Sequence, residues 1–186
     1  YLFASLRETS ATILEGPHAV VRWRLRDTTN TNEAVLFCGD TLATSLNAPK
    51  YSCVFGGPKV AAAIAGVSAT AMSSPRMVRV YGDSLYVADL TNNRVVRFDN
   101  ATASDRSTDT TADGAYGQSN LTTATSQWCD QSDSGLINPV GVAVNGSYLM
   151  VTDSPARDYR PCPRVALFDL KSNTNQAGGV YRNDNN

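Results

Sequence analysis

Two aspartates, Asp89 and Asp153, stand at matching places in two similar stretches of the sequence. Carboxylates repeated in register could form a metal ring or an acid–base pair. An Asp that ends a strand before a turn has a simpler role, because it accepts hydrogen bonds from turn amides and from the Arg that opens the next strand. We therefore interpret Asp89 and Asp153 as structural, with Arg94 and Arg164 opening the strands that follow.

The other chemistry-bearing residues do not form a reactive set. His18 is the only histidine, so a catalytic triad or a histidine metal site would need residues from outside the chain. The sequence contains no G-x-S-x-G elbow and no Walker loop, and Gly56-Gly57-Pro58 is typical of a turn. We predict no catalytic, metal-binding or cofactor-binding residue, and hence no enzyme.

Three arginines alternate with apolar residues in one short stretch, which predicts a strand with a cationic face. They are Arg22, Arg24 and Arg26, between Val21, Trp23 and Leu25. A solvated strand explains this pattern. The sharper hypothesis is a contact face for an anionic glycan or an acidic partner, since three guanidinium groups can bind carboxylates bidentately.

The four cysteines form no C-x-x-C pair, which argues against a zinc site of ordinary spacing. They are Cys38, Cys53, Cys129 and Cys162. Of three possible pairings, we favour Cys38 with Cys53, which closes a short loop, and Cys129 with Cys162, which links two inferred loop insertions. The alternative is four buried thiols in a cytosolic protein.

Three N-x-[ST] sequons occur, at Asn100, Asn120 and Asn145. Chance alone would give a similar number in a chain this rich in Asn, Ser and Thr. Their places are more informative, because Asn145 falls in a predicted hairpin turn and the other two fall at or within a long connector. Secretion would make these positions accessible to glycosylation.

Composition sets the broad class. The 186 residues are 42% apolar, enough for one domain with a real core. A net charge of -1 disfavours nucleic acid as a partner. The longest apolar run, VAAAIAGV at 60–67, is too short to cross a bilayer. The chain opens at Tyr1 without methionine, which favours a processed product or part of something longer.

The sequence contains an internal repeat, the signature of solenoids and propellers. Residues 75–89 read PRMVRVYGDSLYVAD and residues 139–153 read PVGVAVNGSYLMVTD, and they align without a gap at an offset of 64. Further along, RVVRFD at 94–99 aligns with RVALFD at 164–169, and the second copy has six extra residues before this segment. The whole chain is thus expected to be one domain built from similar units.

Each copy has the alternation of a hairpin followed by a third strand. Val78 and Val80 share one face, and the next strand follows a turn that contains glycine. Asn145-Gly146 favours a turn with positive φ at both central positions. Three short strands cannot bury both faces alone, so we expect the copies to pack against one another.

The string P-x-x-V-x-V, followed by L-Y-V-A-D and N-N-R-V-V-R-F, resembles the NHL repeat. The resemblance extends over about 61–170 and implies blades of a β-propeller whose inner strand follows the proline. It also implies a structural turn at Asp89, Asn93 and Arg94. The second copy keeps Asp153 and Arg164 but carries the insertion SPARDYRPCP in place of the Asn-Asn turn.

The pattern weakens outside the two clear repeats. PKYSCVFG at 49–56 can be laid on 75–82, and 19–27 with 34–38 could supply two further strands, so we expect one or two degenerate blades within 17–66. This gives an open or partial propeller of about three to four blades. The Ser- and Thr-rich connector at 101–135 is expected to be a surface loop.

The function predicted from these features is a non-catalytic extracellular propeller that contacts proteins or glycans, as a homo-oligomer or the repeating subunit of a larger assembly or filament. The alternative is a fragment of a propeller lyase or hydrolase whose catalytic residues lie outside the chain. Propeller lyases that resemble the family use several metal-binding histidines, which this sequence does not supply. An RNA-reading NHL domain would need a basic face, and the net charge argues against one.

Overall fold

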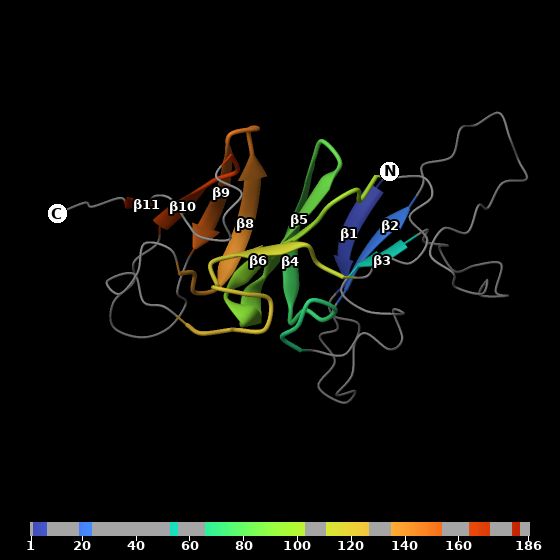
Figure 1. Cartoon of the computed structure of the whole chain (residues 1–186), viewed down its shortest axis with the longest axis horizontal. Coiled ribbons are helices and arrows are strands. Elements are labelled where there is room, and N and C mark those ends of the chain that lie inside the picture. The colour runs from blue at the N-terminus through green and yellow to red at the C-terminus, as the bar shows by residue number, and fades with distance from the viewer. Residues whose placement is uncertain are drawn as a thin grey trace, which may run out of the picture.

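The computed structural model describes residues 66–102, 111–126, 135–153 and 164–171 in full, together with the backbone of four further strands. These parts form antiparallel sheets and contain no α-helix (Figure 1). The predicted all-β class is confirmed. The strands are β1 Leu2–Leu6, β2 Ala19–Trp23, β3 Cys53–Phe55, β4 Pro75–Tyr81, β5 Ser84–Asp89, β6 Arg94–Phe98, β7 Gly114–Tyr116, β8 Pro139–Val144, β9 Tyr148–Asp153, β10 Arg164–Asp169 and β11 Val180–Arg182.

The first clear repeat forms the sheet β4-β5-β6-β7. Val78 pairs with Val87 across the first hairpin, and Val87 pairs with Val96 on the third strand. Such β-branched cross-strand pairs stabilise a sheet whose side chains alternate between two faces. Gly82, at φ 57°, lies in the tight turn, and a short 3-10 turn, Leu90–Asn92, joins β5 to β6.

The second repeat forms the sheet β8-β9-β10-β11 in the same register. Val142 pairs with Val151, and Val151 pairs with Ala166, at the positions that correspond to those in the first sheet. Both sheets also shift register just after the proline that opens their first strand. The prediction that the twin segments fold as equivalent antiparallel sheets is therefore confirmed.

The hairpin turn of the second sheet differs from the prediction. Of the Asn145-Gly146 pair, only Gly146 has a positive φ, of 89°. The Asn145 side-chain oxygen instead accepts hydrogen bonds from the amides of Ser147 and Tyr148. Asn145 thus caps the turn through its side chain, as Asn commonly does, and positive φ at both positions was wrong.

The connector at 101–135 is not all surface loop. Gly114–Tyr116 forms β7 and pairs with β6, with Tyr116 opposite Val95. Ala101, Ala112 and Leu136, at or beside the connector, are buried as well. The expectation failed because composition hides a short strand: three residues bounded by Ser, Thr and Asp leave almost no periodic signal.

The main core lies between the two four-stranded sheets. It joins buried side chains of the first sheet with the inward face of the second, and the Tyr116 and Phe168 rings meet edge to face at 5.5 Å between centroids. Their first strands, β4 and β8, are also neighbours. Complete burial of a side chain such as Phe168 contributes about 1.5–3 kcal/mol. Sheet-on-sheet packing therefore fixes the two repeats against each other.

The third sheet has the order β1-β2-β3, and β1 and β2 lie beside β4. Ala19–Trp23 is a strand, as predicted from 19–27, whereas 34–38 lies outside the described residues. Laying 49–56 on 75–82 predicted a first strand, but Cys53–Phe55 occupies the third position of its sheet. The sheet also uses Leu2–Leu6, outside the degenerate blades expected at 17–66.

Candidate functional site

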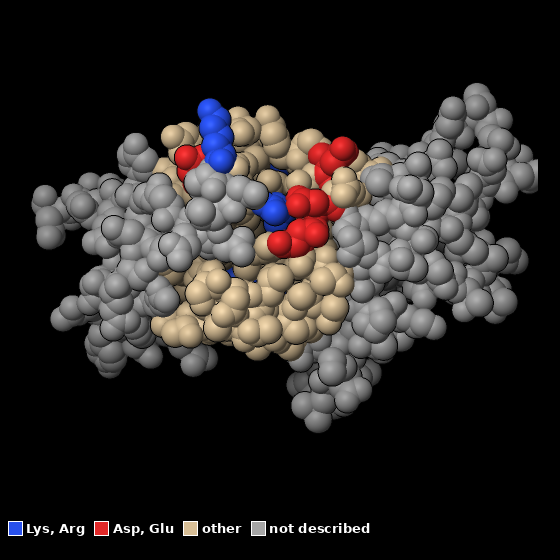
Figure 2. All heavy atoms as spheres, in the orientation of Figure 1, with Lys and Arg blue, Asp and Glu red and all other residues tan. Residues whose placement is uncertain are grey.

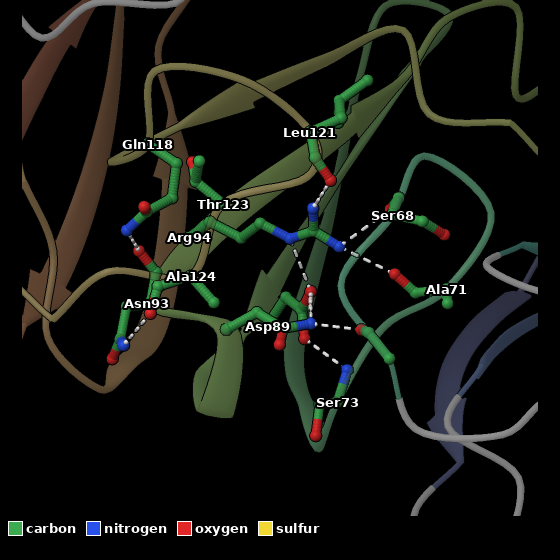
Figure 3. Close-up of polar contacts among 12 residues, drawn as sticks. Ser68, Ala71, Ser73, Asp89, Asn93, Arg94, Gln118, Leu121, Thr123 and Ala124 are labelled. Atoms are coloured by element: carbon green, nitrogen blue, oxygen red, sulfur yellow. Dashed lines mark hydrogen bonds and ion pairs between the residues drawn. The ribbon is translucent and has the colours of Figure 1, made fainter.

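Asp89 is the last residue of β5, and its side chain is completely buried. One oxygen accepts a hydrogen bond from the Ser73 amide at 2.6 Å. The other accepts from Arg94 Nε at 2.7 Å and from the Asn92 side-chain amide at 2.8 Å. Figure 3 shows the carboxylate between the segment that precedes β4 and the start of β6. Three donors therefore hold a charge that solvent does not reach.

Arg94 extends this network in two directions (Figure 3). Its Nη2 donates to the carbonyls of Ser68, at 3.0 Å, and Ala71, at 2.7 Å, in the segment before β4. Its Nη1 donates to the Leu121 carbonyl at 2.6 Å, in the segment after β7. One guanidinium thus ties the entry and exit segments of the sheet to β5.

The second sheet repeats the arrangement. Asp153 accepts from the Ile137 amide at 2.8 Å and from Arg164 Nε at 2.9 Å, and Arg164 Nη2 donates to the Gly135 carbonyl. Ile137 and Gly135 stand 64 residues after Ser73 and Ala71, the offset of the sequence repeat. We call each Asp–Arg pair with its amide and carbonyl partners the lock of its sheet.

Burial decides the proton affinity of both carboxyls. It raises the pKa of Asp89 above its ordinary 3.8, against the opposing effects of the Arg94 guanidinium and the Asn92 and Ser73 amides. It raises the pKa of Asp153 in the same way, against the Ile137 amide and Arg164. Taking a carboxylate out of water disfavours its charged form, and the partners offset only part of that effect.

The locks are structural in geometry. The side chains of Asp89 and Arg94 are both 0% exposed, so neither touches a substrate from this position. The sequence led us to expect that turn amides would bond the carboxylate. The amides come instead from Ser73 and Ile137, two residues before the proline that opens each sheet. A local turn argument could not identify donors 16 residues away.

Asn93 connects the first sheet to the segment that leads into the second. It takes the left-handed conformation at φ 51°, which Asn tolerates better than most residues. Its side chain donates to the Ala124 carbonyl at 3.1 Å and accepts from the Asn138 amide at 3.2 Å. The same turn position in the second copy is Pro163, which has no side-chain amide.

Gln118 completes this connection (Figure 3). Its Nε2 donates to the carbonyls of Asn93, at 2.9 Å, and Thr125, at 2.8 Å, and its Oε1 accepts from the Thr125 amide at 3.0 Å. Sequence reasoning missed Gln118 as a site residue. The signal available in the sequence was the dipeptide Gly117-Gln118 after β7, and it gave no indication that Asn93 and Thr125 would be its partners.

A second polar group, also missed from the sequence, surrounds the half-buried Arg97. Its Nη1 donates to the Tyr116 hydroxyl at 3.2 Å, and its Nε lies 3.1 Å from a carboxylate oxygen of Asp99 without the alignment of a hydrogen bond. Burial, followed by the neighbouring Tyr116, raises the pKa of Tyr86. Tyr86 and Tyr116 also belong to the core between the two sheets.

Charges of both signs share the face seen in Figure 2, where acidic side chains gather beside basic ones. Within the described residues, no group of three or more His, Cys, Asp or Glu side chains could hold a metal ion. None of the helical turns in this same part is long and apolar enough to span a bilayer.

The remaining predicted residues are only partly described. The three sequon asparagines, Asn100, Asn120 and Asn145, are exposed. Arg22 lies in β2 and Cys53 in β3, where the structure describes the backbone alone. The others lie outside the described residues, so the two predicted disulfides and the cationic face stay predictions: these are His18, Arg24, Arg26, Cys38, Cys129 and Cys162.

Comparison with known proteins gives no family for this chain. No family model matches it, and neither a curated protein nor a solved structure is significantly similar to it.

Proposed function

We propose that this chain is a segment of an NHL-type β-propeller that works as a non-catalytic structural and interaction module outside the cell. The observation that carries the proposal is the repetition of a complete unit. Pairing register, the shift after the proline, and the buried Asp–Arg lock all recur in two successive sheets. Stacked four-stranded antiparallel units are the building plan of propellers.

The arrangement of the first strands supports a radial order. β4 and β8 are neighbours, and β1 and β2 lie beside β4 on its other side (Figure 1). In a propeller the first strand of each blade lies nearest the axis, so consecutive first strands meet. Three consecutive sheets fit the three to four blades expected from the sequence.

The locks support a structural role for the repeated carboxylates. Asp89 and Asp153 have partners on both oxygens and are almost completely buried. A carboxylate that serves as a general acid or base must reach the proton it transfers. We therefore assign Asp89 and Asp153 a structural role, in which they hold the linkers in place. The proposed binding surfaces for partners are the exposed sheet surfaces and the predicted cationic strand at Arg22, Arg24 and Arg26.

Exposed sequon asparagines support placement outside the cell. Asn100, Asn120 and Asn145 are accessible at turns or loops, where a glycan attaches without disturbing a strand. Four cysteines that can form two disulfides fit an oxidising compartment.

Binding measurements test the proposed function. The chain is produced through a eukaryotic secretory pathway, immobilised, and probed with soluble copies of itself and with sulfated, carboxylated and neutral polysaccharides. Saturable binding to at least one of these probes is the expected result. Absence of binding to every probe at millimolar concentrations would refute the module as an interaction partner for protein copies or glycans.

A variant with Gln at Arg22, Arg24 and Arg26 separates the two kinds of contact. If the cationic strand binds glycans, this variant loses binding to acidic polysaccharides and keeps its affinity for soluble copies of the chain. Unchanged polysaccharide binding would remove the strand from the contact surface.

A further inference from the structure

The two faces of the β4–β7 sheet pack against different neighbours. On the β4–β7 sheet, one face carries Leu85, Val87 and Phe98, which belong to the core on the side away from β8. The other face carries Tyr86 and Val95, which the β8–β11 sheet covers. We call the first the front face and the second the back face, so the back face of the β4–β7 sheet receives the β8–β11 sheet.

The β8–β11 sheet has the same two faces. Its front face, with Leu149, Val151 and Phe168, is the one that packs on the back face of the β4–β7 sheet. Because pairing register is shared, its back face holds the residues that correspond to the back-face residues of the preceding sheet. These residues are Gly141, Ala143, Met150, Thr152, Val165 and Leu167.

Part of this second back face is exposed to solvent. Val165 is 39% exposed, whereas the corresponding Val95 in the first sheet is 0% exposed. Thr152 is exposed, whereas the corresponding Ala88 is completely buried. Met150 is half-buried and replaces the buried Tyr86. At these three positions a side chain that is buried in the first sheet has a partly or fully exposed counterpart in the second.

The back face of the second sheet also lacks the two arginines found on the back face of the first sheet. Ala143 and Leu167 stand where the first sheet has Arg79 and Arg97. None of its six described residues is charged. Contiguous apolar surface is typical of an interaction site, and an uncharged sheet face can pack against the face of another sheet.

We propose that this back face docks a second copy of the chain, head to tail, with the copy's first sheet, β1–β3, placed against it. The inference rests on the proposed function and names its contact surface. The occupant follows from the order of the sheets, since β1–β3 stands before β4–β7 just as β4–β7 stands before β8–β11. A head-to-tail contact is heterologous, so repeated addition closes a ring or builds a filament.

Sedimentation velocity from micromolar to millimolar concentration tests the proposal with Val165→Arg and a matched control. Val67→Arg makes the same change at a valine of similar exposure, 37%, in the segment before β4. The wild type and Val67→Arg should associate with concentration. Val165→Arg should weaken association at least about tenfold, because a guanidinium would be buried without a partner.

A second variant, Thr152→Arg, probes the same face from an exposed position on β9 and covers the case in which Val165→Arg does not fold. Thermal unfolding checks that each variant is folded. A wild type that stays monomeric over the whole range, or association that is unchanged in both back-face variants, would overturn the proposal. Polysaccharide binding by such a monomer would leave the proposed function standing, so the two failures are distinguishable.

Discussion

Replacing Arg94 by Met tests whether the lock holds the first sheet together. The change removes the guanidinium but keeps a long apolar stem of similar shape. It leaves the buried Asp89 carboxylate with only the Ser73 and Asn92 amides. It also removes the donor from three carbonyls: those of Ser68, Ala71 and Leu121.

The expected cost follows from the burial of both partners. Their side chains are 0% exposed, and breaking such a pair by removing one partner costs about 3–5 kcal/mol. For a chain of this size, each kcal/mol lowers the melting temperature by about 2–4 °C. Arg94→Met should therefore melt about 6–20 °C below the wild type.

Urea unfolding followed by circular dichroism measures the free energy of unfolding directly. Arg79→Met is the matched control, since Arg79 is an exposed arginine on β4 and its loss should change stability by less than about 0.5 kcal/mol. The Asp89→Asn/Arg94→Met double variant should lose less than the sum of the two single variants, because the partners act as one unit.

A loss for Arg94→Met no larger than that for Arg79→Met would refute the reasoning. It would mean that the charge pair contributes nothing beyond what the apolar surroundings and the remaining amides supply. Exact additivity in the double variant would contradict the direct coupling of Asp89 and Arg94 in the same way.

Three further outcomes follow from the structure. Because burial raises the pKa of Asp89, the stability that this carboxyl contributes falls as pH rises above its ordinary 3.8, so urea unfolding should show a larger advantage of wild type over Asp89→Asn at pH about 4 than at pH about 7. Gln118→Ala should lower the free energy of unfolding by about 1–3 kcal/mol, because it leaves buried backbone groups without partners. In the same assay, Ser119→Ala at the exposed neighbouring position should leave the free energy of unfolding almost unchanged. Gly117→Ala should lower the melting temperature more than Gly82→Ala. Both glycines have positive φ, but only at Gly117 would a Cβ meet a leucine side chain, at 2.6 Å.

The sequence was most informative where a pattern repeats. Two stretches 64 residues apart predicted equivalent hairpins with a third strand, and the register of both sheets agrees with that prediction. Strands with alternating Val and Leu are readable because their period of two follows directly from backbone geometry. The Asp and Arg of each lock were also identifiable, since they stand at fixed places in the repeat.

The parts that sequence reasoning missed depend on contacts between distant residues. β7 is three residues long and lies within polar surroundings that suggest a loop. Gln118 bonds Asn93 across 25 positions, and nothing in either neighbourhood points to the other. Ser73 bonds Asp89 across 16 positions through its backbone, which any residue type provides.

The position of the lock explains why a buried ion pair stands where a hydrophobic pair would cost less to bury. Arg94 bonds carbonyls both before β4 and after β7, so it sets the spacing of two linkers as well as joining β5 to β6. An apolar pair would fill the same volume but would leave the direction of those linkers undetermined, because hydrophobic contact is not directional. Linker direction in turn decides how the next sheet meets the back face of the sheet before it. The repeated Asp–Arg pair is thus placed to fix the angle between successive sheets, and with it whether added copies would close into a ring or extend as a filament.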